Sequence, residues 1–457
     1  MKPVRRRAAT PTPRLMALAW PLLLELLLGI LVGVIGTALA AQLSDTAGAA
    51  FAMAGHVAAM IFILFRVVGA GVGVVVAQSL GGGQRAGADA LARAAVGAST
   101  WVGGFTALLT VALAWPLLKL LNAPPEVLPL ALPLLWWWAP ALLLDAWNAS
   151  MAAVMRAHLR ARDTLVVMIA MHATHLALAV PLMRWLGLPG FVLALLAARG
   201  LALALHQARW RAKLQLGLQP RDWWVLRRAE LAAMAHIGLP GAAENIAYRL
   251  CFMVSVAVAG LLGARAVATQ AYAQQIIHLV LLSGVAIGLS METLVGHLVG
   301  AGRLREAHVQ VRRSLALGLG ISVLVATAAA LAGPGLLRIF TDDAQIVAAA
   351  TVLLWWTVLL EPGRTFNLVV INALRAAGDA RYPVVVGAVS MVVVLAGGSW
   401  VLGIELGLGL PGVWIAYAAD EWLRGLLMWR RWARLAWVPH ARHSRRRMAA
   451  RAALSRS

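Results

Sequence analysis

Glutamates within long apolar stretches are the residues of this sequence whose chemistry is hardest to explain as structure alone. Glu25, Glu244 and Glu292 each lack a basic residue three or four positions away on either side. An ionisable side chain in apolar surroundings is costly, and such residues usually serve a function. Because desolvation favours the neutral carboxyl group, each glutamate could take up a proton on one side of a barrier and release it on the other. We therefore treat them as candidates for ion coupling.

Other acidic residues have a basic neighbour on their own helix. Glu361 and Arg364 are three residues apart, and Arg424 follows Asp420 and Glu421 by four and three positions. These spacings place side chains on one helix face. An internal ion pair therefore competes with a coupling role, and we keep Glu361 as a candidate. For the three glutamates above, the alternative is a static pair across helices. The arginines that could form such pairs are Arg66, Arg199 and Arg249.

Two histidines and two asparagines complete the set of candidates. His172 and His175 share a helix face, and histidine titrates near neutral pH, so a proton role competes with hydrogen-bonded packing. A metal site needs about four ligands, and the sequence does not supply them, so we expect no metal. Asn148 and Asn367 either contact substrate or ion, or bond neighbouring helices, which is the commoner role of amides in membranes.

The elements that position these residues are long apolar helices. Hydrophobic residues make up 61% of the chain and charged residues 13%, against about 45–50% and about 25% in soluble proteins. A membrane span needs about 20 mainly apolar residues, so we predict an all-α membrane protein with twelve transmembrane helices. They cover residues 15–41, 49–78, 91–117, 128–149, 164–186, 189–209, 235–262, 266–296, 307–332, 346–372, 383–404 and 410–436.

The net charge of +22 has a topological explanation. Most of the 40 lysines and arginines fall in the two termini and in every second connecting segment. Cytoplasmic loops carry this excess, so we predict a multi-pass protein of the plasma membrane (bacterial inner membrane) with both termini cytoplasmic. No nucleic-acid partner is then needed. We expect residues 1–14 and 437–457 to be basic tails. The second is expected to be solvated and disordered, with contact to anionic lipid as the alternative.

An internal repeat divides the chain into two halves. Adding 219 to a position in the first half repeatedly reaches a related residue in the second, and the last helix of each half follows a shift of 222. Matched residues include Pro21 and Pro240, Glu25 and Glu244, Asn148 and Asn367, and Arg156 and Arg375. We predict two six-helix lobes, residues 15–209 and 235–436, joined by a cytoplasmic linker, 210–234. Since six is even, the lobes share one orientation and a pseudo-twofold axis along the membrane normal.

The repeated motifs resemble those of the multidrug and toxic compound extrusion family. The resemblance lies in residues 19–25 and 238–245 of the first helix of each half, in the segments 76–83 and 295–303, and in residues 374–379. It implies cation-coupled export of cationic, often aromatic compounds. Many bacterial members carry an aspartate where this chain has Gly36, and a glutamate of another branch falls near Tyr248. The usual first-helix cation site is thus absent, and coupling has to be assigned elsewhere.

The sequence thus predicts a secondary active multidrug efflux antiporter that exports organic cations in exchange for H⁺ (or Na⁺) by alternating access. Its expected partners are a small cationic substrate and the lipid bilayer; we expect a monomer and no cofactor beyond the coupling ion. The alternative is a flippase for lipid-linked oligosaccharides, which predicts a basic cavity. We expect no enzyme, because no nucleophile or phosphate-binding motif stands in the right context.

Overall fold

The computed structural model describes residues 15–454, apart from the side chains of residues 59, 60, 62–68, 70 and 451–454. The described residues are helical and contain no strand. The twelve predicted helices are all present. They are α1 (Leu15–Ala41), α2 (Asp45–Gly81), α3 (Arg85–Leu120), α4 (Leu128–Ala157), α5 (Ala161–Leu186), α6 (Leu188–Arg209), α7 (Arg228–Leu261), α8 (Ala264–Gly300), α9 (Leu304–Leu331), α11 (Ala344–Ala376), a composite helix over residues 381–405, and α14 (Gly409–Ala433).

Several helices extend beyond their predicted ends. α4 continues to Ala157 and α11 to Ala376, whereas the apolar pattern ends at residues 149 and 372. α7 begins at Arg228, inside the predicted linker. The reason is that hydropathy marks where a helix leaves the hydrocarbon, while backbone hydrogen bonding continues into the polar boundary. The extra turns of α4 and α11 carry Arg156 and Arg375 into the lobes.

Ten helices in the described part of the chain are long and apolar enough to cross a membrane. The two predicted spans outside these ten are α14 and α2. α14 carries Asp420, Glu421 and Arg424 near its middle, and α2 contains most of the undescribed side chains. The composite helix is α12 (Arg381–Ser390), η3 (Met391–Gly397), α13 (Gly398–Trp400) and η4 (Val401–Glu405), in which η3 and η4 are π-helical. A short helix, α10 (Gly333–Leu337), precedes α11.

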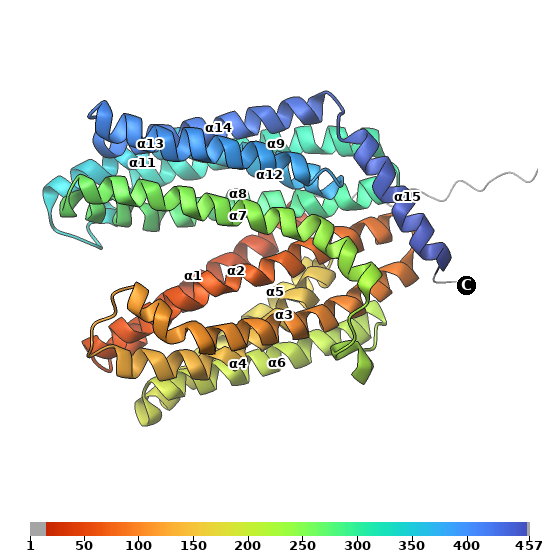
Figure 1. The fold of residues 1–457 in the computed structure, drawn as a ribbon, viewed down its shortest axis with the longest axis horizontal. Helices are drawn as coiled ribbons and strands as arrows, with labels where there is room; N and C mark the ends of the chain where they lie inside the picture. The colour runs from red at the N-terminus through yellow and green to blue at the C-terminus, as the bar shows by residue number, and fades with distance from the viewer. Residues whose placement is uncertain (1–14, 455–457) are drawn as a thin grey trace, which may run out of the picture.

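The helices form two lobes of six (Figure 1). The N-lobe contains α1–α6, and the C-lobe contains α7–α14. Figure 1 shows the lobes converging toward the end that carries the linker and the C-terminal helix, which we call the linker end. There α2 contacts α7 and α8, and α1 contacts α8. The lobes are thus joined mainly through the first two helices of each.

Glycines allow the lobe backbones to meet at the linker end. A Cβ atom on Gly81 would lie 2.1 Å from the carbonyl oxygen of His297, and one on Gly300 would lie 2.0 Å from that of Gln78. Gln78 also donates from Nε2 to the carbonyl oxygen of Ala376 at 2.7 Å. Gly81 and Gly300 are repeat-related. Only glycine permits so close an approach, so the two helix ends touch without intervening side chains.

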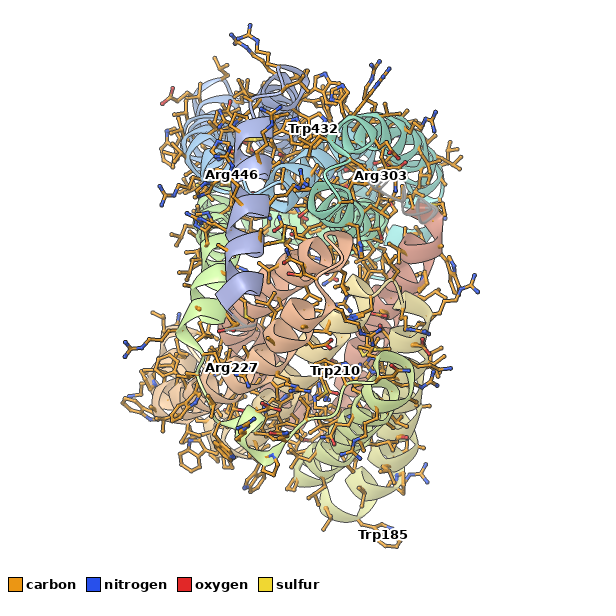
Figure 2. The ribbon with its side chains drawn as sticks, turned by 90° about the vertical axis from the view of Figure 1, so that its right-hand side faces the viewer. Trp185, Trp210, Arg227, Arg303, Trp432 and Arg446 are labelled. Atoms are coloured by element: carbon orange, nitrogen blue, oxygen red, sulfur yellow. The ribbon has the colours of Figure 1, made fainter. Side chains whose placement is uncertain are left out.

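The C-terminal residues form a helix, so the prediction of a disordered tail is wrong. α15 (Val438–Leu454) follows α14 after a short turn and crosses the linker end, as Figures 1 and 2 show. Its Ala441 and Met448 are buried, seven positions apart on one face. Periodicity over the whole segment is hidden by its arginines, but these two residues and the buried Trp437 before them provide a docking face.

Candidate functional site

A glutamate and an arginine pair on the inner wall of each lobe. In the N-lobe, Arg156 at the end of α4 donates from Nη1 to Glu25 Oε2 of α1 at 3.3 Å. In the C-lobe, Arg375 at the end of α11 donates from Nη2 to Glu244 Oε2 of α7. Both members of one pair are related to those of the other by the offset of 219. The repeat therefore conserves an ion pair between the first and fourth helices of each lobe.

These partners differ from the arginines expected from the sequence. Arg199 pairs with Asp145, and Arg249 is exposed. The side chain of Arg66 lies outside those described. Glu25 and Glu244 therefore do form ion pairs between helices, as the alternative predicted. Their partner arginines, however, lie at helix ends that were assigned to loops.

Two cavities lie at these pairs, the first between the N-lobe and α8 of the C-lobe and the second lined by C-lobe residues alone. The first has a volume of about 400 Å³ and includes Glu25 and Arg156 in its lining. The second has about 240 Å³ and includes Glu244 and Arg375. Val285, Leu289 and Glu292 of α8 line both cavities. Glu292, which is 8% exposed, therefore stands between the two repeat-related pairs.

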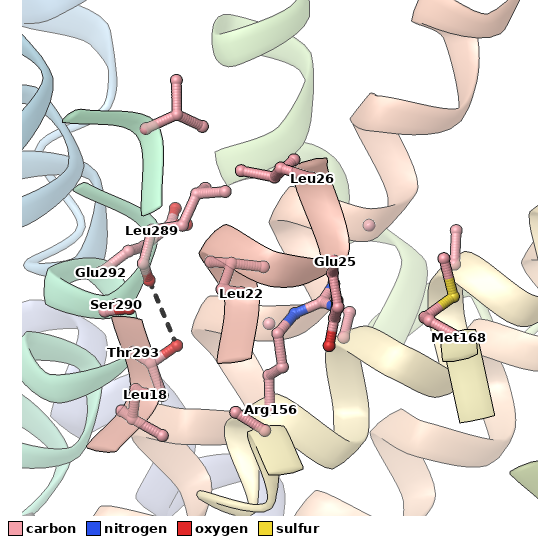
Figure 3. A pocket seen from close by; sticks show the side chains of 16 residues that line it. Leu18, Leu22, Glu25, Leu26, Arg156, Met168, Leu289, Ser290, Glu292 and Thr293 are labelled. Carbon is pink, nitrogen blue, oxygen red and sulfur yellow. Dashed lines mark hydrogen bonds and ion pairs between the residues drawn. The ribbon is translucent and has the colours of Figure 1, made fainter. Parts of the chain in front are cut away.

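The first cavity combines an apolar wall with a few polar groups. Figure 3 shows Glu25 and Arg156 together on the N-lobe side, with Glu292 on the α8 side. Oε1 of Glu25 is buried and has no hydrogen-bond partner among the described residues. An unsatisfied buried acceptor is unfavourable until a donor reaches it. Apolar residues cover the remaining wall, including Leu18, Leu22, Leu26 and Met168.

Five buried charged side chains form a network beside the second cavity. Arg364 of α11 donates to Glu361 Oε1 at 2.5 Å and to Glu421 Oε1 at 3.2 Å. Arg424 of α14 lies 2.7 Å from Asp420 Oδ2 and 3.0 Å from Glu421 Oε1. The same-helix pairs expected for Glu361 and Arg424 are thus present, and Glu421 links them across helices. With every group ionised, these five residues carry one unmatched negative charge.

Two neutral side chains hold this network in place. Ser390, the last residue of α12, donates to Asp420 Oδ1 at 2.6 Å, directly before the π-helical turn η3. Asn367 donates from Nδ2 to Glu421 Oε2 at 2.9 Å, and its Oδ1 is buried with no partner among the described residues. Asn367 therefore lies in the charged site of the C-lobe.

Asn148, the repeat partner of Asn367, has a structural role. It donates to the carbonyl oxygens of Leu144 at 2.9 Å and Arg199 at 3.1 Å, and its Oδ1 lies 2.9 Å from His206 Nδ1. Arg199 in turn donates from Nε to Asp145 Oδ1 at 2.6 Å. These bonds join α4 to α6. The amide is satisfied on both sides, as interhelical hydrogen bonding predicts.

Comparison with known families identifies this architecture. The MatE family model matches residues 21–180 and 240–400, which are one segment in each lobe. The chain belongs to the MatE family. This match confirms the family resemblance that was drawn from the repeated motifs. It also confirms the predicted architecture of twelve helices in two lobes. It also makes the chain a multi-pass membrane protein of a family of transporters.

Curated relatives of this MatE protein are named as transporters or resistance proteins. It is 29% identical over 442 residues to the uncharacterized transporter YisQ of Bacillus subtilis, covering 95% of this chain and 96% of YisQ. It is 23% identical over 412 residues to the multidrug resistance protein PmpM of Pseudomonas aeruginosa, covering 87% of this chain and 83% of PmpM. Both matches include most of the two lobes.

Solved MATE structures share the fold. The bent form of the Vibrio cholerae MATE transporter VcmN superposes with a TM-score of 0.84 at 20% identity, covering 95% of this chain and 97% of VcmN. A MOP superfamily transporter from Pyrococcus furiosus, described as having reversed polarity in its binding pocket, superposes with a TM-score of 0.83 at 17% identity, covering 93% and 96%. At these identities the likeness concerns the fold alone.

Gly36 of this MatE chain, the position in α1 where many bacterial members carry an aspartate, is surrounded by aromatic rings. A Cβ atom on Gly36 would lie 3.1 Å from the ring of Phe191 and 3.2 Å from that of Phe51. The two rings stack edge to face with centroids 4.7 Å apart. His175 is buried with its ring centroid 4.8 Å from that of Phe191. A carboxylate at position 36 would meet these rings rather than polar ligands.

The two candidate histidines do not line either cavity. His175 packs on Phe191, and its Nε2 has no hydrogen-bond partner among the described residues. Both ring nitrogens of His172 are likewise buried without a partner there. This arrangement fits packing better than proton transfer, because a shuttle needs a hydrogen-bonded path. The described residues also contain no cluster of three metal-ligating side chains.

Sequence reasoning missed three residues that complete the site. Arg156 and Arg375 were assigned to loops, and Ser390 gave no signal by type. The repeat held the missing information for the arginines, since Glu25 with Arg156 and Glu244 with Arg375 follow the same offset. Two residue types preserved in both halves, one acidic and one basic, indicate a pair.

Proposed function

We propose that this chain is a secondary active antiporter that exports organic cations in exchange for H⁺, with Na⁺ as the other candidate ion. Alternating access of the cavity between the lobes carries the substrate across the membrane. The observation that supports this most is the unmatched negative charge of the buried C-lobe network beside a cavity. A buried charge without a partner is unfavourable. One bound proton or monovalent cation neutralises it, and its release restores the charge.

The linker end belongs in the cytoplasm in this proposal. The linker, α15 and the arginines near helix ends gather there, which fits the excess of basic residues in cytoplasmic segments. The chain then sits in the bacterial inner membrane with both termini inside. Since the lobe backbones meet at this end, the conformation described here is closed toward the cytoplasm.

Glu25, Glu244 and Glu292 form the part of the site that meets the substrate. Each lines a cavity, and Glu25 Oε1 has a free acceptor position. A cationic substrate competes with Arg156 for Glu25, while a proton removes the negative charge that holds the substrate. Exchange follows because the two cannot neutralise the same carboxylate at once. Glu361 and Asn367 belong to the coupling network behind this wall.

The substrate expected for this cavity is a small organic cation with an apolar body. Leucines and Met168 offer contact area, and methionine adapts to ligands of different shape. The chain acts with its lipid bilayer and without a cofactor, and we propose a monomer because each chain already contains both lobes of the transport unit.

A dye-efflux assay tests this proposal. The full chain is reconstituted in vesicles, a cationic dye is loaded, and a proton or sodium gradient is imposed in turn. Glu25→Gln, Glu244→Gln and Glu292→Gln are each expected to lower gradient-driven efflux by about tenfold, the effect of losing about 1.4 kcal/mol of coupling. The matched control is Glu306→Gln, because Glu306 pairs with Arg303 outside both cavities. Wild-type efflux in all three glutamate variants would contradict the proposal.

The flippase alternative makes the opposite prediction. Its pyrophosphate cargo needs a basic cavity, whereas each arginine named in the two cavity linings has an ion-paired carboxylate. If the vesicles move no cation but do translocate a lipid-linked sugar, the flippase assignment replaces the antiporter.

A further inference from the structure

Two hydrogen bonds cross between the lobes at the linker end, one in each direction. Gln78 of α2 donates from Nε2 to the carbonyl oxygen of Ala376, the last residue of α11, at 2.7 Å. His297 of α8 donates from Nε2 to the carbonyl oxygen of Ala157, the last residue of α4, also at 2.7 Å. The two donors are 219 positions apart, and so are the two acceptors. The repeat therefore preserves a bond from the second helix of each lobe to the fourth helix of the other.

The chemistry of both donors suits this position. A carbonyl oxygen only accepts, so His297 carries a proton on Nε2, as one neutral tautomer and the imidazolium both do. Gln78 is buried and offers its amide to the same kind of acceptor. The last carbonyl groups of a helix have no partner within that helix. Breaking either bond therefore leaves an unsatisfied acceptor between the lobes, which is unfavourable until water reaches it.

Both acceptor helices end in the same kind of turn. Leu159 follows α4 with φ of +62°, and Gly378 follows α11 with φ of +88°. A left-handed residue two positions after the last helical residue stops the helix and turns the chain away, so the last carbonyl group is left for a donor from outside. At Gly378 the turn also passes against α15, where a Cβ atom would lie 2.3 Å from Ser444 Oγ.

Each acceptor directly follows an arginine that is ion-paired at a cavity. Arg156 precedes Ala157 and pairs with Glu25, which lines the first cavity (Figure 3). The C-lobe repeats this order with Arg375 and Glu244, which line the second cavity. The carboxylates therefore hold the same two helix ends that the crossing hydrogen bonds hold. A change of charge in a cavity reaches the contact between the lobes through a single peptide unit.

We propose that Gln78 and His297 form a latch that closes the linker end, and that the charges of the cavity glutamates keep the latch shut. Charged Glu25 holds Arg156, and with it the end of α4, in place for His297. A proton or substrate cation that neutralises Glu25 frees this helix end and weakens the bond. Binding then favours opening because it removes an interaction of the closed state.

The latch explains why the carrier would not change sides empty. With no proton or substrate bound, both glutamates are charged, both helix ends are held and the linker end stays closed. Exchange needs this restraint, because an empty carrier that opened freely would not couple the two flows. Gln78 and His297 touch neither ion nor substrate and are positioning residues. The identity of the neutralising cation rests on the proposed function, but the latch is measured without transport.

Alkylation of buried cysteines tests the latch on the full chain in lipid nanodiscs. Cys251, the sole cysteine, is changed to alanine, and one reporter is introduced, either Ser79→Cys or Ala77→Cys. Both positions are buried, so a water-soluble maleimide reacts at a rate that follows the open fraction. We expect His297→Leu and Gln78→Leu each to raise this rate about threefold, the effect of losing about 0.6 kcal/mol. Unchanged rates in both variants would overturn the proposal.

A conservative variant and a remote one separate the latch from a general loss of packing. His297→Gln copies the donor of the other lobe and should restore the slow rate, so acceleration equal to that of His297→Leu would refute the latch. The matched control is His56→Leu, because His56 bonds the carbonyl oxygen of Ala52 in its own helix at 2.8 Å. It should leave the rate unchanged, and an equal acceleration there would also refute the latch.

The two reporters distinguish opening between the lobes from a movement of α15. Ser79 lies against Met448 of α15, whereas Ala77 faces Gly296 of α8 in the other lobe. Opening of the linker end should accelerate alkylation at both positions. Acceleration at Ser79 alone would show that only α15 moves, and the proposal would be wrong.

Double variants test the link to the cavities. Glu25→Gln frees the end of α4, so it should raise the rate about threefold, as the loss of one such bond does, and His297→Leu should add nothing to it. Gln78→Leu, whose bond ends on α11, should still multiply the rate by about three. With Glu244→Gln the roles of His297 and Gln78 are exchanged. Independent effects in all four pairs would contradict control by the cavity charges.

These rates require no ion gradient, so the latch and the proposed function fail separately. A chain that shows the crossed pattern of double variants but no dye efflux would keep the latch and contradict antiport. A chain that exports dye but shows no pattern would keep antiport and lose the latch.

Discussion

The two lobes place an ion pair at the same two positions with the charges exchanged. Asp145 of α4 pairs with Arg199 of α6 in the N-lobe, and Arg364 of α11 pairs with Glu421 of α14 in the C-lobe. Adding 219 to the position of Asp145 gives Arg364, and adding 222 to that of Arg199 gives Glu421. Both orders of the charges therefore occur at these positions of one scaffold, so neither position needs a particular sign.

The lobes differ more strongly around this shared pair. Glu361, Asp420 and Arg424 of the C-lobe stand where the N-lobe has Leu142, Ala198 and Ala202. At these three positions the N-lobe is apolar and the C-lobe is charged. The N-lobe fills its interior with aromatic rings near Gly36, while the C-lobe keeps a polar network beside its cavity. The two halves share one frame, and only the C-lobe adds Glu361, Asp420 and Arg424 to the shared pairs.

The largest expected effect comes from breaking the C-lobe network. Arg424→Leu leaves Asp420 and Glu421 buried with one cation fewer, so unfolding free energy should fall by about 3–5 kcal/mol. Arg199→Leu should cost less, because the Asp145 and Arg199 side chains are 18% and 16% exposed. Thermal unfolding in detergent, followed by tryptophan fluorescence, measures both. Equal losses in the two lobes would contradict the comparison, and Arg424→Lys is the charge-conserving control.

Exchanging the charges of the N-lobe pair tests whether the scaffold accepts either order of the two charges. Arg199→Glu alone places two carboxylates together and should cost about 3 kcal/mol. Adding Asp145→Arg recreates the C-lobe arrangement and should restore about 1–3 kcal/mol of coupling energy. A double-mutant cycle of unfolding measures the interaction. If the double variant is as unstable as the sum of its single changes, the reversed pair is specific to the C-lobe.

Glu361→Gln removes the unmatched charge of the C-lobe while keeping the size of the side chain. We expect proton-driven efflux to fall by about tenfold, which corresponds to about 1.4 kcal/mol, with little loss of stability because Arg364 retains Glu421. Leu142→Gln places the same side chain at the related N-lobe position and should leave the response to the gradient intact. Vesicle efflux under an imposed pH gradient measures both variants. A similar fall in each would locate coupling outside the C-lobe.

The turns after α4 and α11 give the smallest expected effect. Gly378→Ala puts a Cβ atom into the space of Ser444 at positive φ and should cost about 1–2 kcal/mol. Leu159→Gly, at the related turn of the N-lobe, should be neutral or stabilising by up to about 1 kcal/mol, since glycine adopts that conformation freely. Unfolding of the two variants measures the difference. A neutral Gly378→Ala would mean that α15 does not depend on this turn.

The sequence predicted the fold well because spans and repeats depend on composition and order. All twelve helices follow from apolar runs, and the pairing of halves follows from matched residues such as Pro21 and Pro240. The helix ends were less accurate, since an arginine ends an apolar run without ending a helix. That error removed Arg156 and Arg375 from the candidate site.

The candidate site was predicted only in part, because spacing along the sequence indicates contacts within a helix but not contacts between helices. Pairs within one helix, such as Glu361 with Arg364, follow from spacing alone. Pairs between helices, such as Arg364 with Glu421, depend on how α11 faces α14, and hydropathy carries little information about that rotation. Ser390 gains its role only from contact with Asp420. α15 was missed because its arginines conceal the few buried residues that dock it.

The contact between Gly81 and Gly300 has the symmetry of a homodimer interface. Each glycine meets the backbone next to the other, so the same surface occurs on both sides of the pseudo-twofold axis, as in isologous association. The axis must pass between these two residues. A substitution at either one would meet a carbonyl group of the opposite half, and neither half could accommodate a larger residue there without moving away from the other. The closed seam therefore keeps the geometry of two identical subunits within a single polypeptide.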